Sequence, residues 1–86
     1  MYDLLSDVKK RLRITWEYDN DEISDLIEEA KDWLANRIDG IDFDDTQARK
    51  LVKEYCRYAW NGSISSFEYD FKRDILSLQL EYAVKE

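Results

Sequence analysis

Carboxylates are the side chains of this sequence that are numerous enough to do chemistry. The stretch EYDNDEISDLIEEA, residues 17–30, holds seven of them in fourteen positions. Oxygen ligands of this kind suit Ca²⁺ or Mg²⁺, and a pair of acids can donate and accept protons. The spacing and the surroundings of these acids decide whether either kind of site is present.

The acids lack the spacing of a calcium-binding loop. An EF-hand loop needs oxygen ligands at positions 1, 3 and 5, a glycine at position 6 and a glutamate at position 12. Counted from Asp19, position 6 is Ser24 and position 12 is Ala30, and counted from Asp42 the glycine is missing as well. The run DGIDFDD could hold a cation loosely, but a capped, solvated turn is the simpler interpretation.

Composition excludes most other catalytic sites. The sequence has no histidine and a single cysteine, Cys56, so histidine-dependent nucleophilic sites, histidine-containing zinc sites and internal disulfides are impossible. No glycine-rich phosphate-binding motif occurs. The acids of residues 20–38 lie mostly away from the apolar stripe of that segment, and surface acids rarely catalyse. We therefore expect no enzyme, no catalytic residue, no metal ligand set and no cofactor.

The bulk composition predicts one small domain spanning residues 1–86. With 44% hydrophobic and 38% charged residues the chain should fold. A chain of this length buries only about 60% of the surface that its unfolded form exposes, so oligomerisation would add stability. No apolar run reaches the length of about 18 residues that a membrane span needs, and we expect a soluble, unexported protein without a membrane partner.

The net charge of −7 argues against a general nucleic-acid binder, because affinity for phosphate chains comes mainly from lysine and arginine. The basic run KKRLR, residues 9–13, is the nearest approach to a nucleic-acid patch. We interpret it as the positively charged C-terminal end of a short helix.

Residues that break helices are rare, since there is no proline and the two glycines are Gly40 and Gly62, and this composition favours helices. Apolar residues at helical spacing predict helices at about 4–13, at 20–38, from a cap at Asp44 to Trp60, and from a cap at Ser65 to near the C-terminus. The third should be the most enclosed. We expect an all-α fold, a small four-helix bundle with a short first helix and a long last helix.

Two local patterns add detail to these helices. Asp19 is the predicted N-cap of the second helix, and Tyr18 has the spacing of a hydrophobic staple to Ile23. On the last helix, Leu76 and Leu80, with Ala83, form a second and narrower apolar stripe beside the main one. A helix with two apolar stripes has a second surface to cover, which hints at a partner chain.

Charges divide the predicted domain into two faces. Residues 17–32 carry eight acids and one lysine, whereas residues 49–57 carry four cations and one glutamate. Faces of opposite sign suit a head-to-tail contact between copies that closes into a ring, and pairing within one chain is the alternative. The predicted contact joins Glu22, Asp25, Glu29 and Asp32 of one copy to Arg49, Lys53 and Arg57 of its neighbour.

Three motifs in this order resemble a known family. They are V-K-x-x-L-R-I at 8–14, D-E-I-x-x-L-I-x-x-A at 21–30 and L-x-L-x-Y at 78–82. Over nearly its whole length the chain resembles the small head-tail connector, or head-completion adaptor, family of long-tailed double-stranded DNA bacteriophages and their prophages.

The resemblance implies a structural subunit that assembles as a dodecamer-type ring beneath the portal after the genome is packaged. Such a ring extends the DNA channel and docks the next neck or tail component. The implied partners are further copies of the chain, the portal protein and a neck or tail completion protein, with DNA only as passing cargo. The implied location is the virion neck, after assembly in the host cytoplasm.

A second hypothesis stays open beside this one. A small acidic regulatory module could bind one partner through its acidic second helix, imitating nucleic acid to occupy a basic protein. A carboxylate metal site is the third and least favoured alternative.

Overall fold

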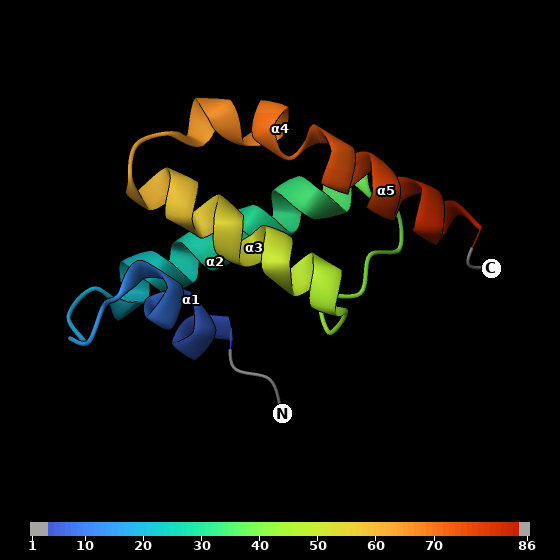
Figure 1. The fold of residues 1–86 in the computed structure, drawn as a ribbon. Coiled ribbons are helices and arrows are strands. Elements are labelled where there is room, and N and C mark those ends of the chain that lie inside the picture. The colour runs from blue at the N-terminus through green and yellow to red at the C-terminus, as the bar shows by residue number, and fades with distance from the viewer. Residues whose placement is uncertain (1–3, 85–86) are drawn as a thin grey trace.

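Residues 4–84 are described by a computed structural model, and no strand occurs among them. Figure 1 shows the elements, which are α1 (Leu4–Leu12), α2 (Asn20–Arg37), α3 (Thr46–Trp60), the 3-10 turn η1 (Ile64–Ser66), α4 (Phe67–Asp70) and α5 (Lys72–Ala83). The all-α prediction is confirmed, and the expected bounds of the first two helices closely match α1 and α2.

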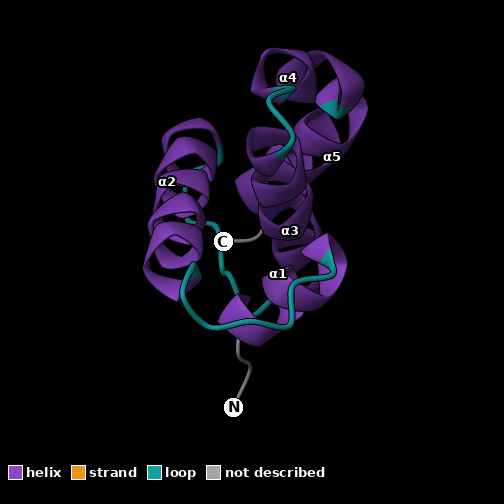
Figure 2. Ribbon diagram, turned by 90° about the vertical axis from the view of Figure 1, so that its left-hand side faces the viewer, coloured by secondary structure: helices purple, strands orange, loops and turns teal. Residues whose placement is uncertain are grey.

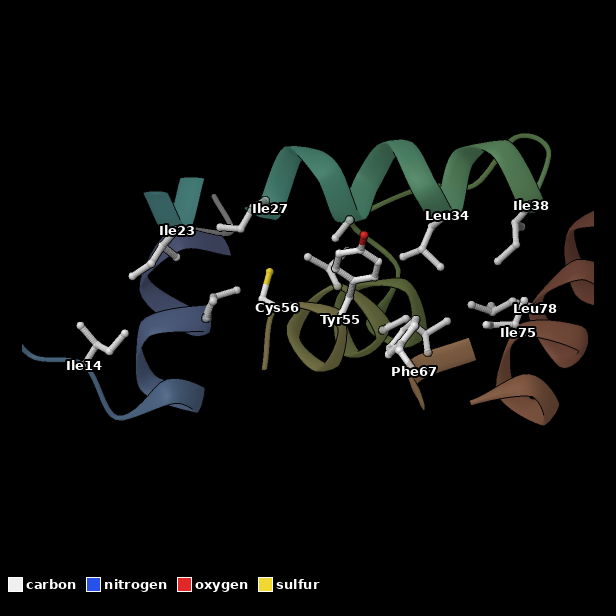
Figure 3. Packing of buried hydrophobic residues seen from close by; sticks show 14 residues of the cluster. Ile14, Ile23, Ile27, Leu34, Ile38, Tyr55, Cys56, Phe67, Ile75 and Leu78 are labelled. Carbon is white, nitrogen blue, oxygen red and sulfur yellow. The ribbon is translucent and has the colours of Figure 1, made fainter. Parts of the chain in front are cut away.

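The centre of the fold is α3, because α1 and α2 both pack against it (Figure 1). Its buried residues are Ala48, Leu51, Val52, Glu54, Tyr55 and Cys56. Figure 3 shows α2 lying along the core, with Leu34 on the side of Tyr55 and Phe67 and with Ile23 near α1 and Ile14. The 3.6-residue period of the apolar positions accounts for this packing, since it places one stripe of each helix against the others.

The prediction of one long last helix is wrong. The segment breaks at Phe71, whose backbone is not helical (φ −110°, ψ 18°), so that α4 and α5 are separate. Phe67 is buried against α3, whereas Ile75 and Leu78 lie near the Ile38 end of α2 (Figure 3). Because the segment bends at Phe71, Phe67 can pack against α3 while Ile75 and Leu78 pack near the end of α2. The architecture is three packed helices, α1, α2 and α3, followed by the segment of α4 and α5, and the expected four-helix bundle is not confirmed.

The start of α3 is set one residue later than predicted. The N-cap is Asp45, whose Oδ1 accepts a hydrogen bond from the Gln47 amide at 3.0 Å. The amide of Asp44 instead donates to Asp42 Oδ1 at 2.9 Å, inside the preceding turn. Two consecutive aspartates are equivalent by residue type, and only the path of the loop decides between them.

α3 ends at Trp60, as the position of Gly62 predicted. The Ser63 amide donates to the Tyr58 carbonyl at 2.8 Å, and the Gly62 amide donates to the Ala59 carbonyl at 3.2 Å. With φ +76° at Gly62, this is a Schellman motif, in which a left-handed residue lets the last carbonyls find partners. Gly40 is also left-handed, in the turn that follows α2.

The same motif ends α1 without a glycine. The Ile14 amide donates to the Lys9 carbonyl at 2.9 Å, and Arg13 holds the left-handed position with φ +62°. That conformation costs about 1–2 kcal/mol for a residue with a Cβ. The burial of Ile14 in the core offsets this cost.

The loop between α1 and α2 carries two stacked aromatic rings. Trp16 and Tyr18 lie 5.8 Å apart, centroid to centroid, with 21° between their planes. The Trp16 indole donates from Nε1 to Asp19 Oδ2 at 2.6 Å. Asp19 is the N-cap of α2 as predicted, but its side chain makes no capping bond. Tyr18 is 83% exposed, so the predicted staple to Ile23 is wrong.

Phe67→Ala is expected to lower the free energy of unfolding by about 3–5 kcal/mol, because it removes the centre of an aromatic cluster and leaves a cavity. The Phe67 ring lies 5.1–5.7 Å, centroid to centroid, from the rings of Trp33, Tyr55, Tyr58 and Phe71. Urea denaturation followed by circular dichroism measures the loss.

The matched control is Tyr69→Ala, two residues further along, where the ring is 84% exposed. Its free energy of unfolding should change by less than about 0.5 kcal/mol. Similar losses in the two variants would contradict the central role of Phe67.

Candidate interaction surfaces

The predicted acidic residues form an exposed face on α2, which we call the acidic face. Glu22, Asp25 and Asp32 are exposed, and none of them forms an ion pair with another residue in 4–84. By the 3.6-residue period, Asp25 and Asp32 lie on the side of α2 opposite its buried residues, and Glu22 lies at the flank. The structure therefore leaves these three carboxylates available to a partner.

The fourth predicted acid, Glu29, is partly used within the chain. Its Oε2 accepts a hydrogen bond from the Tyr55 hydroxyl at 2.8 Å, which ties α2 to α3. Burial, with this bond and the nearby carboxylate charge, raises the pKa of Tyr55 to about 12. Burial and the same charge raise the pKa of the Cys56 thiol to about 12. Cys56 is thus a small apolar core residue rather than a reactive thiol.

The three predicted cations of α3 differ from one another. Arg49 donates to the Asp44 carbonyl and, at 3.4 Å, to the Thr46 hydroxyl, so it stabilises the start of its own helix. Arg57 donates from Nε and Nη2 to one carboxylate oxygen of Glu54, at 2.9 and 2.8 Å. Lys53 forms no ion pair within the described residues.

Glu54 is a buried acid at the centre of this basic region, and sequence reasoning missed its role. Only 3% of the residue is exposed. Arg57 binds one carboxylate oxygen, and Arg11 of α1 binds the other through Nη2. The hydrogen bonds to Glu54 and the charge of its carboxylate raise the pKa of the Arg57 guanidinium above its usual range. The available signal was that Glu54 is the one acid among residues 49–57, although nothing local points to Arg11.

The cations of α1 and α3 form one surface, which we call the basic patch: Lys10, Arg11, Lys53 and Arg57. Three of them, with Asp7, line a shallow depression of about 280 Å³ between the two helices. In the sequence these residues belong to two features, the KKRLR run and the basic third helix. The fold joins them, because Arg11 must reach Glu54.

The acidic face and the basic patch belong to different sides of the molecule. Figure 2 shows α2 on one side and α3, α4 and α5 on the other. The core-facing residues of α2 point toward α3 (Figure 3), so its acids point away from it. The two surfaces cannot neutralise each other within one copy.

Neither a metal centre nor a membrane span is found in the part of the chain that the structure describes. Within residues 4–84, no three side chains of the metal-binding types His, Cys, Asp and Glu come together as an ion would need. None of the helices there is long and apolar enough to cross a membrane.

Comparison with known proteins finds one family. The family model described as phage gp6-like head-tail connector protein matches residues 2–86. No curated protein and no solved structure matches the chain.

Arg57→Glu is expected to lower the free energy of unfolding by about 2–4 kcal/mol. The change removes one of the two partners of a buried carboxylate and places a second acid beside it, and the estimate is reduced because Arg57 is itself 40% exposed. Thermal and urea denaturation measure the effect.

Lys53→Glu, on the same helix but without an ion pair, is the matched control and should stay within about 0.5 kcal/mol of the wild type. Equal stability of the two variants would show that Glu54 does not depend on Arg57.

The free energy of unfolding is expected to fall as the pH rises above about 9. In the unfolded chain Cys56 and Tyr55 ionise at their ordinary pKa values of 9.0 and 10.0, whereas in the folded chain both values are about 12. Raised folded values favour the neutral forms, so the stability is complete below pH 9 and is lost between about pH 9 and 12, at up to about 1.4 kcal/mol per pH unit for each group.

Urea denaturation at a series of pH values measures this loss. In Cys56→Ala the decline should begin one unit later, near the Tyr55 value for the unfolded chain. A wild-type stability that stays constant through this alkaline range would contradict the burial of both groups.

Proposed function

The chain belongs to the phage gp6-like head-tail connector family, and we propose that it is a non-enzymatic subunit of a dodecamer-type ring beneath the portal. In this role the ring lies in the virion neck, extends the DNA channel and docks a neck or tail completion protein. Its partners are further copies, the portal protein and that completion protein, and DNA passes only as cargo. Family membership supports the connector role, and the charge distribution supports the contact between copies.

The contact that we propose joins the acidic face of one copy to the basic patch of the next. The observation that carries it is that three acids of the acidic face and two cations of the basic patch, Lys10 and Lys53, form no ion pair within residues 4–84 and stand on different sides of one small domain. Such surfaces are complementary between copies and not within one. A contact between two different surfaces is heterologous, and it closes into a ring when the rotation per copy allows.

The residues predicted for this contact divide into two groups. Glu22, Asp25 and Asp32 with Lys53 are available for pairing between copies. The internal bonds of Glu29, Arg49 and Arg57 to Tyr55, to the start of α3 and to Glu54 make them supporting residues, which hold the two surfaces in shape. Lys10 of α1 joins the available group, because it lies beside Lys53.

An acidic subunit also suits a channel for DNA. A net charge of −7 repels phosphate chains, so a ring of such subunits would let DNA pass without adhering to it. In this arrangement the basic patch is covered by the neighbouring copy and is withdrawn from the passing DNA.

Lys10→Glu with Lys53→Glu is expected to weaken self-association about tenfold or more, because two cations facing acids become two acids. Lys10 is exposed and Lys53 half-buried, and neither forms an ion pair within the described residues, so the fold should be retained. Sedimentation velocity at low and at high salt measures the association, and salt should reduce the difference between wild type and variant.

The matched control restores the charge complementarity. A chain that carries Glu22→Lys and Asp25→Lys in addition has the wild-type net charge and two reversed surfaces, and it should associate again. Unchanged association in the two-residue variant, or no recovery in the four-residue variant, would remove this contact. Co-purification with portal or tail proteins tests the connector role independently of the contact.

A further inference from the structure

A groove lies where α4 meets α5, and its lining is part apolar and part polar. It has a volume of about 700 Å³ and is lined by Tyr58, Phe71 and Leu76, with Tyr69 exposed beside them. Tyr58 donates from its hydroxyl to Asp70 Oδ2 at 2.7 Å, which fixes one edge. The groove lies at the break between α4 and α5, and Phe71, the residue at the break, is part of its lining.

The rim of the groove is positively charged. Lys72 and Arg73 line it, and neither forms an ion pair within residues 4–84. The acid beside them, Asp70, is already bound to Tyr58. An exposed apolar strip continues along α5 to Leu80, which is 70% exposed. The occupant that fits has an aromatic or aliphatic centre surrounded by acids.

The chain itself presents such a group in the loop between α1 and α2, which we call the aromatic tip: Trp16 and Tyr18. The two rings are stacked, and the bond from Trp16 to Asp19 holds them in place. Of the acids around the tip, Glu17 forms an ion pair with Lys9 at 3.5 Å and Asp19 is bound to Trp16, whereas Asp21 and Glu22 form no ion pair within residues 4–84. Exposed tyrosine and tryptophan are the residue types that most often dominate the binding energy of interfaces. Because the tip is already ordered, little conformational entropy is lost when it binds.

The tip and the groove lie in different parts of the molecule. Figures 1 and 2 both place the α1–α2 loop away from the junction of α4 and α5. A tip therefore reaches a groove only in another copy. The tip continues directly into the acidic start of α2, whereas the groove lies with α3 on the other side of the molecule. Both proposed contacts therefore join the α2 side of one copy to the α3 side of the next.

We infer that the aromatic tip of one copy inserts into the α4–α5 groove of the next, with its acids against Lys72 and Arg73. The occupant of the groove is a second copy of this chain. This inference rests on the proposed function, because it adds an apolar anchor to the head-to-tail contact. It explains why the second apolar stripe of α5 is left uncovered in a single copy.

Two variants test the insertion by sedimentation velocity, at concentrations up to the millimolar range. Tyr18→Ser removes the tip, and Leu76→Asp places an acid in the groove. Each alone should weaken self-association about tenfold or more. Both positions are well exposed, at 83% and 49%, so circular dichroism should show an unchanged fold. Val84→Asp, an exposed apolar residue outside tip and groove, is the control and should associate as the wild type does.

Mixing the two variants gives the decisive result. The Leu76→Asp chain keeps its tip and the Tyr18→Ser chain keeps its groove, so an equimolar mixture should form one-to-one dimers that grow no further. Weak association without this recovery overturns the insertion. Normal association of both single variants also overturns it but leaves the charged contact in place. A wild-type chain that stays monomeric throughout overturns both the insertion and unaided self-assembly.

Discussion

The fold depends on a single constraint, which is that the other elements have to cover the apolar surface of α3. A chain of 86 residues has apolar material for one core, and α1, α2, η1 and α4 all contact that one helix. The result is thin in one direction, with extents of 41 × 30 × 17 Å. Since a helix with its side chains is about 10–12 Å across, such a body is two layers deep. Most residues then lie close to a surface.

The buried carboxylate of Glu54 shows how the core and the surface are linked. An acid that is removed from water is costly unless its charge is compensated, and here two arginines from different helices provide that compensation. Arg11 is thereby held against α3, and Lys10 comes with it because it is the preceding residue of the same helix. The basic patch is therefore a consequence of how α1 is fastened to α3. The bonds that fasten α1 to α3 thus also bring Lys10 and Lys53 together on one surface.

The sequence predicted the features that depend on neighbouring residues. The spacing of Ile23, Ile27 and Leu34 was enough to predict α2, and Gly62 marked the end of α3. The second apolar stripe of the last segment was also predicted, and Leu76 and Leu80 are indeed exposed. What failed was decided by distant contacts. The bond between Arg11 and Glu54 joins residues 43 positions apart, and the break at Phe71 depends on where the core ends rather than on the local residues. The assignment of Asp44 as the cap failed for a smaller reason, because residue type does not distinguish it from Asp45.

The exposed apolar residues have the same cause, which is that a chain this short forms only one small core. An isolated subunit of this size has little stability to spare, and large apolar side chains on its surface add none. They become useful when a neighbouring copy covers them, because the buried area that a small domain lacks is then supplied by the contact between copies. The negative charge acts against premature contact, since subunits that repel one another stay dispersed at low concentration. The head-to-tail arrangement that we propose would resolve this opposition, because it would bring the acidic side of one copy only against the basic side of the next. In that proposal the order of charges along the surface selects the orientation, and the apolar anchor adds buried area to the contact.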